Sequence, residues 1–231
     1  MHCSSGETKI AATATELIIA GWTGRDRAAV EAHIEELAAL GVPRPRRVPV
    51  FYRLASSLLA QDDAIEVVGS ACSGEAEAVV MRFGGELWVG LGSDHTDRKL
   101  ESISVSVAKQ VCAKPLARAV WPLSEASDHW DRLILRSYIL TTGGRELYQE
   151  GELGANLSAL ELIRQYAGGA GLREGAVMFC GTLPVRGSFR SGARFELELE
   201  DPVRRRSLRH SYGIQQLAET QEFSMLNGMD E

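Results

Sequence analysis

Three carboxylates in one short segment are spaced so that they could share a metal ion. Residues 74–98 are predicted to form two strands joined by the glycine pair at 84–85, which is typical of a tight hairpin turn. Pairing across this turn places Glu75 opposite Asp94, and the alternation of side chains along a strand puts Glu77 on the same face as Glu75. Neighbouring carboxylates repel one another unless a cation or a proton neutralises them. The segment therefore predicts a site for a hard cation such as magnesium, manganese or calcium.

This prediction depends on the register of the hairpin. A two-residue turn makes the numbers of paired residues sum to a constant, which gives the pairs Phe83 with Glu86, Glu77 with Gly92 and Glu75 with Asp94. A longer turn would move the aspartate away from its partner. The alternative interpretation is a solvated strand face that runs into a polar loop at residues 93–97, held by Asx turns.

The elements that must position these groups are mostly short strands. Apolar alternation and turn residues predict further strands at 14–20, 65–68, 103–107, 133–140, 177–180 and 195–199. Helices are predicted at 27–40 and from Ser158 to about Tyr166, where the serine can cap the first turn. This mixture favours an α+β fold with a largely antiparallel or mixed sheet over a parallel doubly wound fold. The sequence contains no phosphate-binding glycine loop and no dinucleotide fingerprint.

The helix predicted at 27–40 carries two residues that could do acid–base chemistry. Asp26 can cap it, and it has one apolar stripe formed by Val30, Ile34, Leu37 and Leu40. His33 and Glu36 lie three apart beside that stripe, where they could orient and activate a water molecule if the helix closes over a site as a lid. The alternative is a rigidly docked helix on which both residues face solvent.

Composition narrows the class of protein. A chain of 231 residues can bury one substantial core, and its net charge of −6 argues against a nucleic-acid surface, which would need a basic stripe. No apolar run is long enough for a membrane span, and no signal peptide is apparent. The four scattered cysteines form no CxxC pair, which makes zinc or a disulfide framework unexpected. We therefore expect a cytoplasmic protein.

The order of motifs along the chain resembles that of the fumarylacetoacetate hydrolase superfamily, and most closely a little-characterised branch of it. Each motif is short, and their order and spacing over about residues 20–215 carry the resemblance. The matching residues are Gly24-Arg25-Asp26, His33, Glu36, the connector at 45–53, Glu75 and Glu77, the segment Ser93-Asp94-His95-Thr96-Asp97-Arg98, Lys109, Gln149 and Gly181-Thr182.

The resemblance implies a function and a set of site residues. It implies magnesium, or else manganese or calcium, held by the same trio of Glu75, Glu77 and Asp94. The reaction would be C–C bond hydrolysis, hydration or decarboxylation of a small 2-oxo acid through a metal-stabilised enolate. The remaining roles fall on Lys109, Arg98, His33 and Glu36 as catalytic residues, and on Arg25, Tyr52, Gln149 and Thr182 as substrate-binding residues.

The resemblance also implies an architecture. The expected fold is a mixed, mainly β rolled sandwich or barrel with a few peripheral helices, and the expected assembly is a homodimer. We divide the chain into an N-terminal strand, lid helix and connector at 1–48, a catalytic β-roll domain at 49–215 and a C-terminal tail at 216–231. Two departures from the family pattern, Glu101 in place of a glutamine and Ala193 in place of an aspartate, bear on the substrate.

Two other functions are also compatible with the sequence. A thiol enzyme would use Cys112 or Cys180 with His95 or His129. A non-catalytic ligand-binding or scaffold protein would keep the fold without turnover, because a fold does not determine a function. If Lys109 is a surface residue, Lys114 is the next candidate for the active-site lysine.

Overall fold

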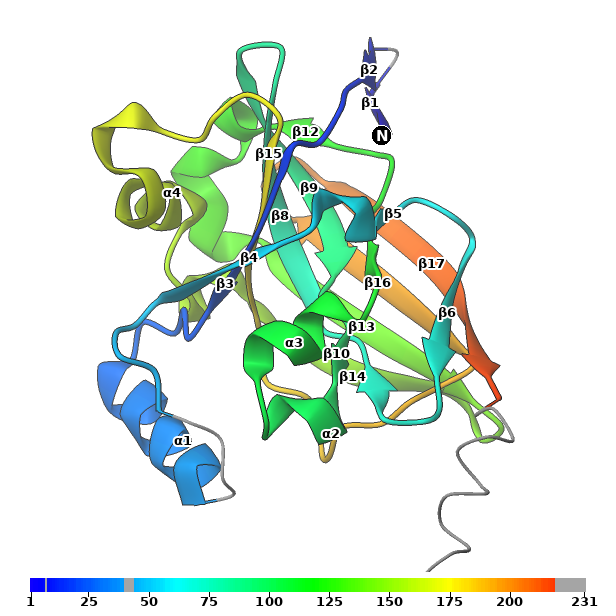
Figure 1. Cartoon of the computed structure of the whole chain (residues 1–231). Helices are drawn as coiled ribbons and strands as arrows, with labels where there is room; N and C mark the ends of the chain where they lie inside the picture. Colours follow the sequence, from blue (N-terminus) through cyan, green and yellow to red (C-terminus); the bar gives the residue numbers. More distant parts are fainter. Residues whose placement is uncertain (7, 40–43, 219–231) are drawn as a thin grey trace, which may run out of the picture.

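Two sheets, one of six strands and one of five, are the main layers of the fold in the computed structural model, which describes residues 1–6, 8–39 and 44–218 (Figure 1). The side chains of Thr8, His33 and Leu37 are outside that description. The six-stranded sheet has the order β12 (Trp121–Pro122), β9 (Glu86–Ser93), β8 (Ala76–Phe83), β15 (Ala176–Thr182), β3 (Glu16–Gly21), β4 (Val50–Leu54). The five-stranded sheet has the order β14 (Gly144–Glu152), β13 (Ile134–Thr141), β16 (Arg194–Asp201), β17 (Arg206–Leu217), β6 (Ala64–Val68).

Smaller elements complete the described chain. The two-stranded pairs are β1 (His2–Ser5) with β2 (Thr8–Ala11), β10 (Thr96–Asp97) with β7 (Cys72–Ser73), and β11 (Lys114–Pro115) with β5 (Leu59–Ala60). The α-helices are α1 (Arg27–Ala39), α2 (Arg98–Glu101), α3 (Val105–Gln110) and α4 (Ala159–Ala167). Single 3₁₀ turns lie at Ser56–Leu58, Leu123–Glu125, Leu153–Ala155 and Gly168–Ala170, with a longer 3₁₀ segment at Ser127–Arg132.

The predicted fold class is confirmed. Both large sheets are mixed, because β15 runs parallel to β3 and β17 runs parallel to β6 while their other neighbours are antiparallel. Each sheet keeps two edge strands among the described residues, so the architecture is a sandwich and no closed barrel forms. Strands β8 and β9 pack against β13, β16 and β17, which joins the layers.

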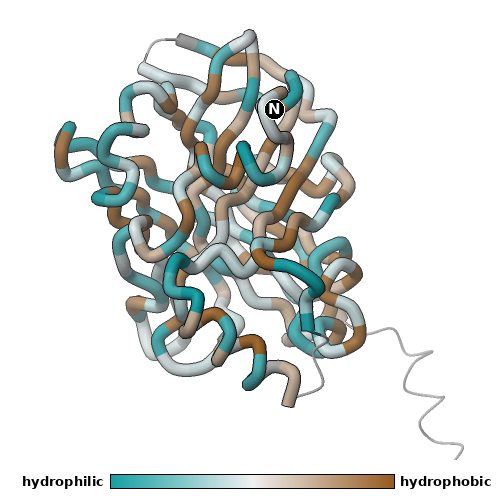
Figure 2. The backbone as a smooth tube through the Cα atoms, turned by 90° about the vertical axis from the view of Figure 1, so that its left-hand side faces the viewer, coloured by the Kyte–Doolittle hydropathy of each residue, from teal (hydrophilic) through white to brown (hydrophobic). Residues whose placement is uncertain are grey.

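The six-stranded sheet is apolar on both faces, and this explains the composition of its strands. In β8, Ala78 and Val80 belong to the core shared with the five-stranded sheet, whereas Val79 and Met81 belong to a second core on the opposite face. Figure 2 shows stretches of strongly hydrophobic residues alternating with hydrophilic ones along the chain. Because side chains alternate along a strand, Glu77 lies on the face of Val79, away from the five-stranded sheet.

Most of the predicted elements are confirmed, and the hairpin is confirmed in register. Phe83 pairs with Glu86 and Glu77 with Gly92. The Asp94 amide donates a hydrogen bond to the Glu75 carbonyl at 2.9 Å. The other confirmed elements are β3, β6, β13, β15, β16, α1 with its Asp26 cap, and α4 with a capping box at Ser158.

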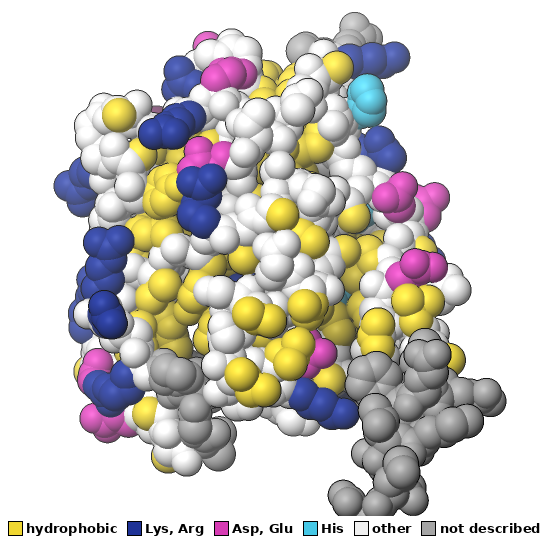
Figure 3. Space-filling model, in the orientation of Figure 1, with side chains coloured by type: hydrophobic (Ala, Val, Ile, Leu, Met, Phe, Trp, Pro, Cys, Tyr) yellow, Lys and Arg dark blue, Asp and Glu magenta, His cyan; other side chains and the backbone are white. Residues whose placement is uncertain are grey.

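The strand predicted at 103–107 is wrong. The segment belongs to the α2–α3 region, where Ser104 accepts a hydrogen bond from the Val107 amide and caps α3. The apolar alternation that suggested a strand instead leaves Ile103, Val107 and Val111 exposed on one side of the helical segment. Figure 3 shows hydrophobic side chains at the surface over this region. The helix period turns Ala108 and Lys109 inward.

The first 48 residues contribute to the main core. Strand β3 lies between β15 and β4, and its Leu17 and Ile18 are fully buried. The division at residue 49 stays a prediction, and so does the tail, since residues 219–231 are outside the description. Helix α1 extends from one side of the molecule and buries Ile34, while Leu40 is also outside the described ranges (Figure 1). None of the described helices is both long enough and apolar enough to traverse a bilayer.

Candidate active site

The three predicted carboxylates lie together where the β8–β9 hairpin ends. Glu75 precedes β8, Glu77 is its second residue, and Asp94 follows β9. Their relative exposures are 9%, 2% and 0%, so the alternative of a solvated strand face is wrong. Charged groups buried to this degree need cations or protons beside them.

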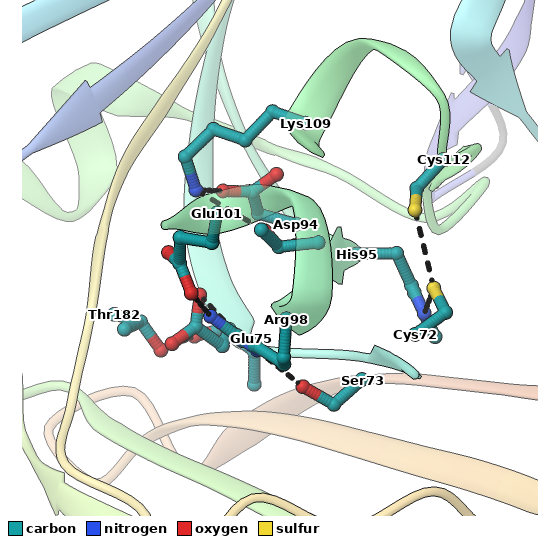
Figure 4. Close-up of polar contacts among 12 residues, drawn as sticks. Cys72, Ser73, Glu75, Asp94, His95, Arg98, Glu101, Lys109, Cys112 and Thr182 are labelled. Atoms are coloured by element: carbon teal, nitrogen blue, oxygen red, sulfur yellow. Dashed lines mark hydrogen bonds and ion pairs between the residues drawn. The ribbon is translucent and has the colours of Figure 1, made fainter. Parts of the chain in front are cut away.

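Helix α3 brings Lys109 to this cluster. The Lys109 ammonium forms an ion pair with Asp94 Oδ2 and lies 3.3 Å from Thr96 Oγ1 (Figure 4). Burial lowers the pKa of Lys109, but the charges of Asp94 and Glu75 outweigh it and hold the pKa above its ordinary value. A lysine whose pKa is raised in this way is suited to electrostatic stabilisation rather than to general-base catalysis.

Arg98 connects a second carboxylate to the surrounding chain. Its Nε donates to Ser73 Oγ at 2.6 Å, and its guanidinium lies 3.3 Å from Glu75 Oε2 and 3.0 Å from Glu101 Oε2 (Figure 4). The half-exposed Phe189 ring stacks over the guanidinium at 3.8 Å. Glu101, the departure from the family pattern, thus adds a negative charge that Arg98 neutralises.

The third carboxylate, Glu77, is held by a bulge in β15. Gly181 donates its N–H to Glu77 Oε2 at 2.7 Å. The φ of Gly181 is +92°, and a Cβ at this position would collide with Thr23 Oγ1, so glycine is required here. Burial, and then the charges of Asp94 and Glu75, raise the pKa of Glu77 well above its ordinary value. The carboxylate is therefore poised to exchange a proton for a cation.

Gln149, on β14 of the five-stranded sheet, and Thr182, at the end of β15, support the hairpin. Gln149 is fully buried; its Oε1 accepts from the Ala76 amide and Ser137 Oγ, and its Nε2 donates to Thr182 Oγ1 and the Leu183 carbonyl. The amide has two donors and two lone pairs, and all of them are engaged within the protein. The geometry therefore favours a supporting role for Gln149 over the substrate contact that the sequence suggested. Thr182 Oγ1 also donates to the Ala76 carbonyl at 2.9 Å.

The other predicted site residues differ in their distance from the carboxylates. Tyr52 in β4 lies near the cluster, with its ring centroid 5.9 Å from Lys109 Nζ. Arg25 instead makes a bidentate ion pair with Asp131, at 2.5 and 2.7 Å. Glu36 is exposed on α1, and the His33 side chain is outside the description, so the lid pair stays a prediction.

A second lysine, Lys114, is as deeply buried as the carboxylates. Its exposure is 0%, and its ammonium lies 3.3 Å from Asp94 Oδ1. From the sequence it was only the alternative to Lys109, because a lysine is by residue type most often at the surface. The structure brings both lysines to the same carboxylate.

The thiol alternative is not supported by the geometry. His95 Nδ1 contacts Cys72 Sγ at 3.3 Å, and Cys72 in turn contacts Cys112 Sγ at 3.2 Å (Figure 4). His129 pairs with Asp201, and burial raises the pKa of the Cys180 thiol. In the described part of the chain, neither Cys112 nor Cys180 is hydrogen-bonded to His95 or His129, and all four cysteines are buried away from substrate.

The buried His95 side chain is expected to make the stability of the fold depend on pH. Burial, followed by the charge of Lys114, lowers its pKa from 6.5 to about 3. Below an unfolded-state pKa of about 6.5 the unfolded chain binds a proton that the folded protein does not bind, so stability falls with falling pH. We expect a contribution of about 2 kcal/mol to be lost by about pH 5. Urea unfolding of the wild type should show this loss and His95→Gln should lack it, with the exposed His2→Gln as the control. An unchanged pH dependence in His95→Gln would contradict the assignment.

Comparison with known protein families identifies the family of this chain. The chain matches the family described as "Protein of unknown function (DUF2848)" over residues 20–212, a range that contains every site residue above. The chain belongs to this family. No curated protein matches this DUF2848 member.

Solved structures similar to this DUF2848 member confirm the predicted fold. Yeast ynq8, a fumarylacetoacetate hydrolase family protein, has a TM-score of 0.64 at 15% identity over 88% of this chain and 94% of its own. The 5-carboxymethyl-2-hydroxymuconate delta-isomerase of Mycobacterium smegmatis has a TM-score of 0.62 at 14% identity, over 91% and 79%. Maleylpyruvate hydrolase from Sphingobium sp. SYK-6, solved with manganese(II) and pyruvate, has a TM-score of 0.60 at 13% identity, over 88% and 71%. The resemblance to the fumarylacetoacetate hydrolase superfamily therefore holds at the level of the fold.

The trio of carboxylates fits a hard divalent cation by donor type and charge. Asp94 Oδ1 is buried, has no hydrogen-bond partner and could act as a ligand, while Asp94 Oδ2 is held by Lys109. As the side chains stand, no three His, Cys, Asp or Glu groups in the described ranges are arranged to hold a metal ion. Glu75 is paired with Arg98 and Glu77 with the Gly181 amide, so these two side chains would have to rotate towards Asp94 for all three carboxylates to bind one metal ion.

Proposed function

We propose that this DUF2848 member is a divalent-metal-dependent enzyme that acts on a small 2-oxo acid by C–C bond hydrolysis, hydration or decarboxylation. The observation that carries the proposal is the buried group of Glu75, Glu77 and Asp94, with Lys109 paired to Asp94. The fold, shared with a maleylpyruvate hydrolase solved with manganese and pyruvate, supports the same chemistry. Magnesium or manganese would bind the three carboxylates, and calcium is the third candidate.

In the proposed mechanism, different residues of this chain have different roles. A bound divalent ion supplies a Lewis acid for the 2-oxo carbonyl. The positive charges of Lys109 and Arg98 attract the substrate carboxylate and stabilise the negative charge that develops during the reaction. Tyr52 lies beside Lys109, where its hydroxyl and ring can orient the substrate. His33 and Glu36 would activate water if α1 closes over the site as a lid. The proposed assembly is a homodimer.

A screen of 2-oxo acids tests this proposal. Purified protein is incubated with acylpyruvates, 2-hydroxydienoates and oxaloacetate, with added magnesium or manganese, and with or without EDTA. We expect turnover of at least one compound that is lost in EDTA and restored by excess metal. Turnover that is unaffected by EDTA would contradict the metal. No turnover of any compound, with binding retained, would favour the alternative of a non-catalytic ligand-binding protein.

A further inference from the structure

Arg98 has two negatively charged partners within the protein. Its guanidinium lies 3.0 Å from Glu101 Oε2 and 3.3 Å from Glu75 Oε2 (Figure 4). Glu101 is the last residue of α2, three positions after Arg98, so the two side chains lie on one face of this short helix. Their side chains are only 17% and 24% exposed, so solvent screens the ion pair weakly. The charge of Arg98 is therefore compensated before a substrate binds.

Metal binding would leave Glu101 as the counter-ion of Arg98. If Glu75 rotates towards Asp94 to bind a metal ion, Arg98 loses one of its two partners and keeps the other. Its Nη2 is buried without a hydrogen-bond partner, so it can donate to one substrate carboxylate at the metal. A second carboxylate at the same guanidinium would meet the negative charge of Glu101, and like charges in a partly buried contact repel each other.

The charge of Glu101 also acts on the other side chains of the site. Burial raises the pKa of Tyr52, the charge of Lys109 lowers it, and the negative charges of Glu101 and Asp94 raise it again. Glu101 is thus close enough to Tyr52 for its charge to affect the hydroxyl. An anionic group that enters the space beside these residues would experience the same repulsion.

The loop that follows β15 offers paired arginines rather than free ones. Arg186 lies 3.0 Å from a carboxylate oxygen of Glu150, and Arg190 lies 3.5 Å from one of Glu146. A carboxylate at the far end of a substrate would have to displace one of these partners before either arginine could bind it. Desolvating an anion without a cation beside it is costly.

The same loop presents an aromatic ring at the edge of the site. The centroid of the Phe189 ring lies 3.8 Å from the guanidinium carbon of Arg98, and the residue is 48% exposed. A ring stacked over a cation on one face keeps its other face for a further group. Phe189 therefore offers apolar surface beside the cation that faces the substrate.

We propose that Glu101 and Phe189 restrict the substrate to 2-oxo monocarboxylic acids with an uncharged tail. Glu101 compensates the charge of Arg98 and repels a second carboxylate, and Phe189 packs against an apolar tail. The inference rests on the proposed function, because it names the class of 2-oxo acid that the same site takes.

Two acids that differ in one group test the role of Glu101. The compounds 2-oxopentanoate and 2-oxoglutarate share one carbon skeleton, and the last group is a methyl in the first and a carboxylate in the second. Titration calorimetry measures the affinity of the manganese-loaded protein for each. We expect the wild type to bind 2-oxopentanoate at least about tenfold more tightly. Glu101→Gln should reduce this ratio at least about fivefold by strengthening the binding of 2-oxoglutarate.

A second variant separates the charge of Glu101 from its shape. Glu101→Ala removes the carboxylate without supplying an amide, and it should shift the ratio in the same direction as Glu101→Gln. The matched control is Glu86→Gln, which removes the same charge at an exposed position at the opposite end of β9 from Asp94 and should leave the ratio unchanged. A ratio that stays at the wild-type value in both Glu101 variants would overturn the proposal.

The role of Phe189 is tested with a substrate that has no tail to contact. Phe189→Ala should weaken the binding of 2-oxopentanoate at least about fivefold and that of pyruvate less than about twofold. Equal losses for the two acids would contradict the contact with the tail. If the wild type binds both five-carbon acids with equal affinity, this inference alone is wrong. Failure of the manganese-loaded wild type to bind any of the three acids would instead overturn the proposed function.

Discussion

Glu77→Gln is expected to lower the affinity of the protein for manganese at least about a hundredfold, since even residues outside the ligand set cost about 10–100-fold in metal affinity. Glu77 is 2% exposed, and its carboxylate repels those of Asp94 and Glu75. The amide keeps the shape of the side chain and removes one charged oxygen donor. Titration calorimetry with manganese measures the change directly.

The control for Glu77→Gln lies in the same hairpin. Glu86 is an exposed residue at the first position of β9, and Glu86→Gln should leave manganese affinity unchanged. In EDTA, Glu77→Gln should unfold no earlier than the wild type, because the raised pKa of Glu77 favours its neutral form without a cation and the amide is neutral as well. Equal manganese affinity in Glu77→Gln and the wild type would mean that this carboxylate is not a ligand.

Lys109→Met should reduce turnover of the active 2-oxo acid at least about a hundredfold, the loss typical of removing one group that stabilises negative charge in a transition state. The neighbouring carboxylates raise the pKa of Lys109, so it stays charged throughout the neutral range. Methionine keeps most of the apolar stem and removes the ammonium. Turnover and unfolding temperature are measured on the same preparation.

The matched control is Lys99→Met on α2, where the side chain is exposed. It should retain full turnover. We expect the loss in Lys109→Met to appear mainly in kcat, because the ammonium meets charge that develops during the reaction. Near wild-type turnover in Lys109→Met would remove Lys109 from the mechanism and leave Lys114 as the remaining buried lysine at Asp94.

The hairpin and its carboxylates were predictable because their geometry is local. Two glycines set the turn, the turn sets the register, and the register places Glu75 opposite Asp94. Each step depends on neighbours in the sequence, and the structure confirms the pairing. The fold class was predictable from the count of short strands. Whether the sheets close into a barrel was not predictable, because closure depends on how distant edge strands pair.

The second layer of the site was not predictable from periodicity. The alternating residues at 103–107 predict a strand, but in the structure Ser104 caps helix α3. That helix turns Lys109 inward. Gln149 has donors and acceptors that fit a substrate, and only long-range contacts show that all of them are used within the protein. Burial of Lys114 likewise arises from three carbonyls that the fold brings together.

Anomalous diffraction from crystals grown with manganese and pyruvate tests the central claim most directly. We predict one manganese peak enclosed by carboxylate oxygens of Glu75, Glu77 and Asp94, with the pyruvate carboxylate facing Lys109. Crystals of Asp94→Asn grown in the same way should lack the peak. A manganese peak at other residues, or none in the wild type at saturating metal, would contradict a metal site at these three carboxylates.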